Sequence, residues 1–180
     1  MTIKITTKHQ QFAHVLSYLT LFGALMLPLM AATIWLFWNQ LAPFASLNLH
    51  HIFDLRQLSV GERLAGFTVS LIGATIQAYG LLGLRKTFCE AAANKPLSEQ
   101  AIYGFRRFAW VTLTMVFIGV AQRTGLIIIF SLSDPAQQGM LDIQLGTEEL
   151  KSLFMGLLLV FVAHIFAEGK KAKDENEAFL

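Results

Sequence analysis

The segment Phe108–Leu132 reads "FAWVTLTMVFIGVAQRTGLIIIFSL", and Arg123 is its single charged residue. A helix needs roughly 20 consecutive apolar residues to cross a hydrocarbon core about 30 Å thick. This segment is long enough to do so, and an arginine within it is costly enough to require a structural or functional reason. The sequence therefore predicts a transmembrane helix that carries one informative charge.

The composition of the whole chain is typical of a membrane protein. Of the 180 residues, 54% are hydrophobic and 14% are charged, and the mean hydropathy is +0.53, whereas soluble domains usually have about 45–50% apolar residues. Cys89 is the one cysteine, which excludes an intrachain disulfide and a cysteine metal site. Four segments are long and apolar enough to be spans, namely 15–38, 64–84, 108–132 and 150–167. The sequence thus predicts an all-α integral membrane bundle of four transmembrane helices in one domain.

Lysine and arginine are distributed unevenly over the segments that connect these spans. Ten of the 14 fall in the N-terminal tail, the second connection and the C-terminal tail, whereas three fall in the other two connections or their helix ends. Because positively charged segments stay in the cytoplasm, both termini are predicted to be cytoplasmic. Trp35 and Trp38 would then mark the outer interface, with Tyr103 and Trp110 near the inner one.

The second connection is long enough to extend the helices that it joins. The residues Asn94–Leu97, with a proline among them, are typical of a turn between two helices. We therefore expect spans two and three to continue into the cytoplasm as a helical hairpin over 85–107, with a cytoplasmic tail over 168–180. At the outer end of the second span, Ser59 and Glu62 have the spacing of a capping box, which predicts where that helix begins.

Arg123 has three interpretations that the sequence leaves open. Its guanidinium can reach the outer interface, or pair there with a carboxylate, for which Glu62, Glu149 and Asp54 are candidates near outer helix ends. It can instead anchor an anionic small molecule or lipid headgroup between helices, or line a proton or ion path. Gln122 precedes it and Thr124 follows, so we expect this side of the helix to face the bundle interior.

The second span carries a stripe of small and mildly polar residues. Gly66, Gly73 and Gly80 recur at heptad spacing, with Ser70 and Gln77 between them. Such a stripe permits close packing of a neighbouring helix, or it lines a ligand site, and Gln77 is expected to point inward because an amide is unfavourable in lipid. The candidate ligand-binding residues are Arg123, Gln122, Gln77 and Ser70.

Two histidine-containing groups invite a metal assignment, which we do not make. His164 and Glu168 are four residues apart and share one face of the fourth span, but two ligands do not form a site, so we interpret them as a hydrogen-bonded pair. His50, His51 and Asp54 lie in the first connection, where a wet amphipathic segment is the preferred interpretation. The sequence predicts no metal and no cofactor.

Two segments resemble a known family. The first is Leu84–Leu113, "LRKTFCEAAANKPLSEQAIYGFRRFAWVTL", with an arginine-led helix, a short turn and a second helix with paired arginines. The second is Gly156–Leu180, "GLLLVFVAHIFAEGKKAKDENEAFL", which joins a final span to a charged tail. Together they resemble the bacterial membrane family catalogued as domain of unknown function 2975. The chain departs from that pattern at Leu97, where an aromatic residue is usual, and at its Ala-Phe-Leu end. Members often look like partners of a small helix-turn-helix regulator encoded nearby, so the resemblance implies a sensory or regulatory membrane protein and transfers no catalytic residue.

These observations favour a non-enzymatic protein of the bacterial cytoplasmic (inner) membrane. The nucleotide-binding, metalloprotease and hydrolase motifs are absent from the sequence, and a net charge of +2 is too small to predict nucleic-acid binding. We expect a cytoplasmic regulator protein as the partner, besides the lipid bilayer and a homo-oligomer. The predicted partner surface consists of Arg85, Lys86, Arg106, Arg107, Glu168, Lys170 and Lys171. A small transporter or channel-like protein, or an immunity or stress protein of the membrane, are the alternatives.

Overall fold

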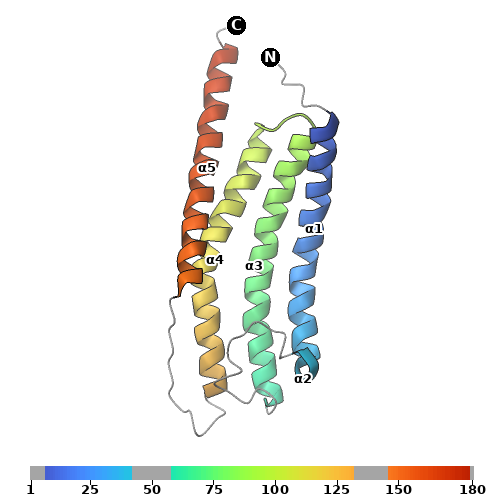
Figure 1. The fold of residues 1–180 in the computed structure, drawn as a ribbon, viewed down its shortest axis with the longest axis vertical. Coiled ribbons are helices and arrows are strands. Elements are labelled where there is room, and N and C mark those ends of the chain that lie inside the picture. The colour runs from blue at the N-terminus through green and yellow to red at the C-terminus, as the bar shows by residue number, and fades with distance from the viewer. Residues whose placement is uncertain (1–6, 42–57, 132–145, 179–180) are drawn as a thin grey trace.

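The computed structural model describes residues 7–41, 58–131 and 146–178, and the regular secondary structure of these ranges is all helical (Figure 1). Its four long helices are α1 (Thr7–Leu36), α3 (Val60–Ala92), α4 (Glu99–Ser131) and α5 (Thr147–Ala178), and α2 (Trp38–Leu41) is a single turn after α1. Each long helix is long and apolar enough to cross a membrane. The all-α fold with four helices able to cross a membrane, predicted from the sequence, is confirmed. α3 and α5 extend beyond their predicted spans at both ends, whereas α1 and α4 do so at their N-terminal ends.

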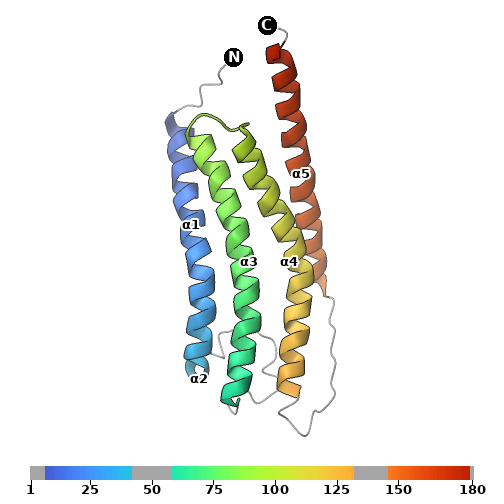
Figure 2. The ribbon, with the colours of Figure 1, turned by 180° about the vertical axis from the view of Figure 1, so that it is seen from behind.

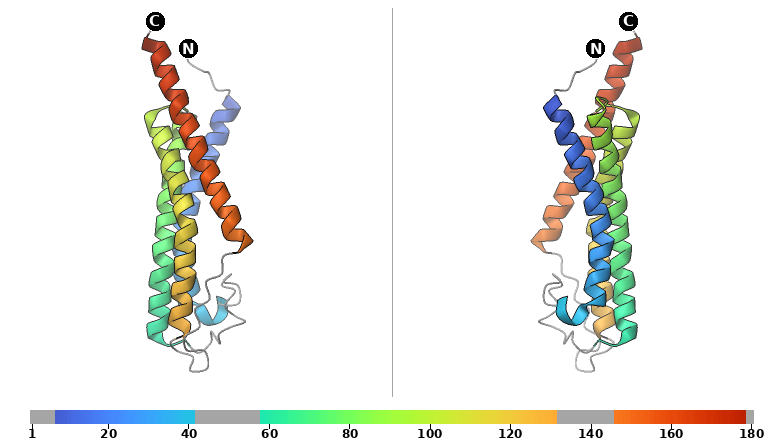
Figure 3. Two further views of the ribbon diagram at one scale, coloured as in Figure 1. Left: turned by 90° about the vertical axis from the view of Figure 1, so that its left-hand side faces the viewer. Right: turned by 90° about the vertical axis from the view of Figure 1, so that its right-hand side faces the viewer.

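The four long helices are arranged in a row instead of a closed bundle. α1 packs against α3, α3 against α4, and α4 against α5, and α1 and α5 share no substantial interface within the described ranges. Figures 1 and 2 show α3 and α4 in the middle of the row, with the start of α1 and the end of α5 on the same side. Figure 3 shows that α1 and α5 are inclined relative to the α3–α4 pair.

Local interactions define where α3 begins and how it turns into α4. Ser59 is the N-cap of α3: its backbone N–H donates to the Glu62 carboxylate (2.8 Å), and its Oγ accepts from the Glu62 N–H (3.4 Å). This is the predicted capping box. At the other end, Asn94 adopts a positive φ of 62°, a conformation that asparagine tolerates well. The Thr87 hydroxyl then donates to the Ala101 carbonyl across the turn at 2.8 Å, which ties α3 to α4.

The glycine stripe of α3 faces two neighbouring helices and is filled by their side chains. A methyl group on Gly66 would overlap the Trp35 ring of α1, and one on Gly73 would overlap the Gln122 amide of α4. On Gly80 it would lie 2.7 Å from a Val111 side-chain carbon of α4. The packing interpretation of the stripe is therefore the one that the structure supports, because each glycine makes room for a partner side chain.

The same rule applies at the interface of α4 and α5. A methyl group on Gly156 of α5 would lie 2.9 Å from the Cα atom of Leu113 on α4. Further along, the rings of Phe105 and Phe166 are in contact, with centroids 5.4 Å apart. α4 and α5 therefore form a close antiparallel pair over much of their length.

The glycine packing gives a stability prediction with an internal control. Gly66→Ala should lower the free energy of unfolding in detergent by about 1–3 kcal/mol, because the indole of Trp35 is held by other contacts and cannot move away. Apart from its chain neighbours and the backbone of its own helix, a methyl group on Gly119 of α4 would meet no described atom within 4 Å, so Gly119→Ala should be neutral or stabilising by up to about 1 kcal/mol. Equal destabilisation by both substitutions, measured by titration with a denaturing detergent, would contradict the assigned packing.

Candidate functional site

One level of the molecule contains a polar contact between each pair of neighbouring long helices, and we call it the polar layer. It consists of Trp35, Val69, Ser70, Gln122, Arg123 and Glu149. Val69 and Ser70 are adjacent on α3, and Gln122 and Arg123 are adjacent on α4, so the three contacts follow one another across the row. Three of the four candidate ligand-binding residues therefore come together here.

The contact between α1 and α3 is made by a buried tryptophan. The Trp35 indole N–H donates to Ser70 Oγ at 3.0 Å, while its ring stacks on Trp38 with centroids 4.5 Å apart. Both rings are buried in a cluster with Leu126 and Ile127 of α4. The expectation that these tryptophans mark the depth of the outer interface stays a prediction, and their rings fill the packing between helices.

The contact between α3 and α4 is made by a glutamine and a backbone carbonyl. Gln122 Nε2 donates to the Val69 carbonyl oxygen at 2.7 Å. Its amide occupies the space left by the missing side chain of Gly73. A bond from a polar side chain to a neighbouring helix removes an unpaired amide from an apolar environment, and it typically contributes about 0.6 kcal/mol in membrane proteins. Gln122 therefore faces the interior, as predicted.

The contact between α4 and α5 is the ion pair of Arg123. Its Nη1 lies 3.5 Å from Glu149 Oε1, and the two side chains are 32% and 24% exposed. The other carboxylate oxygen of Glu149 accepts a hydrogen bond from the Gly146 N–H at 2.8 Å, in front of the first turn of α5. Of the three carboxylates that the sequence offered, Glu149 is the partner in the structure, and it also caps α5. Asp54 lies outside the described residues.

Gln77 is a correction to the sequence-based expectation. It was expected to point into the bundle, but it lies on the exposed side of α3 and has no hydrogen bond within the described ranges. Ser70, seven residues earlier on the same side of α3, meets Trp35 of α1, whereas no described residue forms a hydrogen bond with Gln77. Gln77 is therefore not part of the polar layer.

The polar layer has the chemistry of a structural connection. Its three polar contacts each join two neighbouring helices of the row. The described residues contain no group of three or more histidine, cysteine or acidic side chains that could hold a metal. His164 and Glu168 are both exposed and share no hydrogen bond, so the predicted pair is not formed. His50 and His51 lie outside the described residues.

At the opposite end of the row, four cations of the predicted partner surface lie near the α3–α4 turn. Arg85, Lys86, Arg106 and Arg107 have no carboxylate within ion-pair distance in the described part of the chain. The Arg107 guanidinium lies over the Tyr79 ring, 4.2 Å from its centroid, a favourable cation–π geometry. The Nε atoms of Arg85 and Arg107 are buried without a hydrogen-bond acceptor. These cations therefore lack protein counter-ions in the described ranges.

The remaining members of the predicted partner surface lie on α5. Lys170 pairs with Glu99 of α4 at 3.6 Å and also with Asp174 one turn further along α5. Glu168 and Lys171 are exposed. A groove of about 460 Å³ lies between this part of α5 and the ends of α3 and α4 near the turn. The sequence did not indicate the groove or the Glu99–Lys170 pair, because their residues come from three helices.

Comparison of this chain with protein-family models, with curated proteins and with solved structures finds no match. The function is therefore inferred from the contacts, distances and burial of the described residues.

The ion pair predicts how substitutions affect stability. Arg123→Leu should lower the thermal unfolding midpoint in detergent by a few degrees. The substitution keeps the hydrogen bond from the Gly146 N–H to Glu149 but removes the cation that pairs with this carboxylate. Glu149→Ala should lower it further, because it removes both the pair and the cap. Lys151→Leu is the matched control: Lys151 and its partner Glu148 are 71% and 78% exposed, so this substitution should have almost no effect. A variant Arg123→Leu as stable as the wild type would indicate that Arg123 is retained for a ligand.

Proposed function

We propose that this protein is a non-enzymatic, multi-pass protein of the bacterial cytoplasmic membrane that has a sensory or regulatory role and acts on a cytoplasmic partner. The observation that carries the proposal is the end of α5. The helix continues beyond the α3–α4 turn, as Figure 1 shows, and every residue from Lys171 to Ala178 is exposed. A charged helix end that no other part of the described structure covers is suited to binding another protein.

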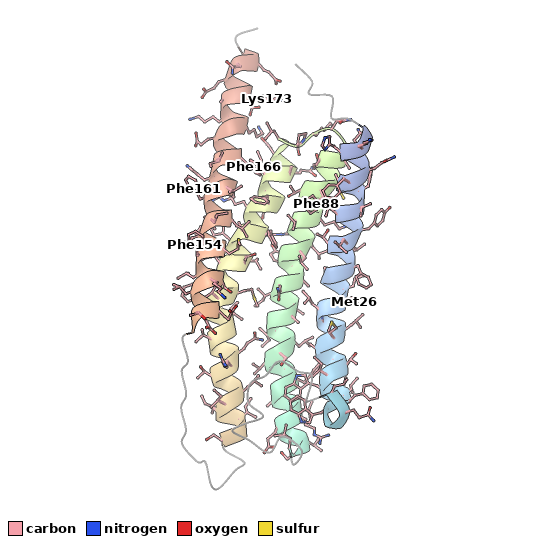
Figure 4. The ribbon with its side chains drawn as sticks, in the orientation of Figure 1. Met26, Phe88, Phe154, Phe161, Phe166 and Lys173 are labelled. Carbon is pink, nitrogen blue, oxygen red and sulfur yellow. The ribbon has the colours of Figure 1, made fainter. Side chains whose placement is uncertain are left out.

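Figure 4 helps to locate this surface. Lys173 lies on the projecting part of α5, whereas Phe154 and Phe161 lie lower on the same helix. Their side chains are 67% and 64% exposed, as expected of residues in contact with lipid. α5 therefore changes along its length from an apolar helix to a solvated, charged one. We propose that the first part lies in the bilayer and the second part reaches the cytoplasm.

The proposed orientation places both termini and the α3–α4 hairpin in the cytoplasm. It is supported by the four cations near the turn that lack counter-ions in the described ranges, since positively charged segments are retained on the cytoplasmic side. It is also consistent with membership of the family catalogued as domain of unknown function 2975, which stays a proposal based on the quoted segments. Under this proposal, the polar layer lies in the outer half of the bilayer, about 24 Å from Arg107 at 1.5 Å per residue.

A transporter or channel-like protein has less support. Such a protein lines its path with polar groups at several depths, whereas Gln122 and Arg123 share one level and are engaged with Val69 and Glu149. Gln77, the other polar side chain that the sequence suggested for a path, is exposed on the outside of α3.

The native cysteine tests the orientation. Cys89 is exposed near the end of α3, so in intact bacteria it should not react with a membrane-impermeant thiol reagent and should react once the inner membrane is permeabilised. As controls, cysteines introduced at Ser46 and Gln137 in a Cys89→Ser background should react in intact cells, since the sequence predicts both connections to be outside. Labelling of Cys89 in intact cells together with protection of the two introduced cysteines would reverse the orientation.

Truncation tests the partner surface. Deleting Lys171–Leu180 removes the projecting end of α5 but keeps Lys170 and its pair with Glu99. We expect normal insertion and an unchanged unfolding midpoint, with loss of any co-purifying cytoplasmic protein and of the regulatory output. The double substitution Glu148→Gln and Lys151→Gln removes an ion pair from the opposite end of the same helix and should change neither. Retention of partner and output by the truncated protein would show that the tail is only a solvated end.

A further inference from the structure

The groove near the α3–α4 turn has the features of a binding site for a phosphorylated headgroup. Its cationic side chains come from three helices: Lys86 of α3, Arg106 of α4 and Lys170 of α5. Tyr103 contributes a phenol, and Glu99 is the one carboxylate among the lining residues. The groove therefore combines an excess of positive charge with an aromatic hydroxyl.

Two of the three cations are available for a ligand. Lys86 and Arg106 are exposed and have no hydrogen bond or ion pair within the described ranges. Lys170 is already engaged by Glu99 and Asp174, so it serves mainly to hold α5 against α4. An anion in the groove would thus be bound chiefly between Lys86 and Arg106, and a guanidinium paired with an ammonium is well suited to phosphate.

The position of the groove along the helices, in the proposed orientation, favours the bilayer as the source of this anion. Arg106 lies about 26 Å along α4 from Arg123 and Tyr103 about 30 Å. Since Arg123 lies in the outer half of a hydrocarbon core about 30 Å thick in that orientation, Arg106 and Tyr103 lie at or just beyond its inner boundary. Tyrosine is enriched at this depth, where its ring contacts acyl chains and its hydroxyl reaches the headgroup region of the membrane. The lining cations therefore lie at the level of lipid phosphates.

The surface of α4 next to the groove provides a place for an acyl chain. Trp110 and Phe117 follow Tyr103 at intervals of seven residues on one side of the helix, and they are 50% and 64% exposed. Ile102 and Ala167 add apolar contacts within the groove itself. A protein partner in the cytoplasm would contact the groove but not this apolar stripe, which lies on the membrane side of it.

We propose that this groove binds an anionic phospholipid of the cytoplasmic leaflet. Lys86 and Arg106 bind the phosphate, the Tyr103 hydroxyl donates a hydrogen bond to the headgroup, and an acyl chain lies along Trp110 and Phe117. Basic grooves between transmembrane helices on the cytoplasmic side commonly bind such headgroups. This site is separate from the projecting end of α5, so it does not depend on the proposed partner.

Lipid titration of the full-length protein tests the site. The purified protein, in an uncharged maltoside detergent, is titrated with dioleoyl phosphatidylglycerol, and bound lipid is counted by native mass spectrometry. We expect one saturable site, and Lys86→Gln with Arg106→Gln should weaken binding roughly 25-fold, because each cation near an anionic surface contributes about fivefold. Lys171→Gln with Lys173→Gln removes the same charge from the exposed end of α5 and should leave the affinity unchanged.

A substitution that removes a negative charge makes the test more specific. Glu99→Gln removes the carboxylate from the groove, so it should tighten phosphatidylglycerol binding severalfold. The unfolding midpoint of each lipid-free variant shows whether it is folded. If Glu99→Gln weakened phosphatidylglycerol binding as much as the double substitution of Lys86 and Arg106, the electrostatic assignment would be overturned.

Three further results would overturn the proposal. The first is equal affinity for the zwitterionic dioleoyl phosphatidylcholine, and the second is an equal loss of affinity in the Lys171 and Lys173 control, which would indicate nonspecific attraction. The third is full competition by millimolar inorganic phosphate or glycerol 1-phosphate, which would assign the groove to a soluble anion. If the Lys86 and Arg106 variant lost a co-purifying protein but kept phosphatidylglycerol binding, the groove would be a protein interface.

Discussion

The polar layer is the constraint on which the arrangement of this protein depends. Apolar surface alone does not fix the register of helices in a bilayer, because lipid tails satisfy it as well as another helix does. Polar groups behave differently, since a donor or acceptor left unpaired in hydrocarbon costs several kcal/mol. The bonds of Trp35 with Ser70 and of Gln122 with Val69, together with the Arg123–Glu149 pair, therefore fix each helix of the row against the next at one level.

The glycines of α3 explain how one helix can hold two neighbours. Gly66 makes room for Trp35 of α1, whereas Gly73 and Gly80 make room for Gln122 and Val111 of α4. Heptad spacing puts the three glycines on nearly the same side of α3. That side therefore contacts both α1 and α4. The burial of Trp35 and Trp38 against Leu126 and Ile127 agrees with this, because it brings the end of α1 onto α4. The polar layer and the glycine stripe are thus two parts of one packing arrangement.

Much of this fold could be predicted from the sequence, because its signals are local. The length of the apolar segments predicted the four helices, and the Ser59–Glu62 spacing predicted the start of α3. The position of Arg123 near outer helix ends suggested three carboxylate partners, and in the described residues it pairs with Glu149. The remaining features depend on how helices approach one another. Gln77 was assigned to the interior because it belongs to the glycine stripe in sequence, yet it is exposed, whereas Ser70 on the same side of α3 meets Trp35. The sequence position of Trp35 and Trp38 predicted their depth, but it did not predict that their rings are buried between helices.

The attachment of α5 links the outer part of the protein to its projecting end. Glu149 pairs with Arg123 near the start of the helix, and Lys170 pairs with Glu99 near the other end of α4. The helix rises roughly 32 Å from Glu149 to Lys170. α5 is thus held to α4 by an ion pair at each end of this stretch, and an interface that includes Gly156 lies between them. Since the residues after Lys170 continue the same helix, a shift of α5 at either ion pair would move the projecting end as a rigid extension. The groove at Lys86 and Arg106 adjoins the inner of these two pairs, so a lipid bound there would act on the pair that holds α5 nearest to that end.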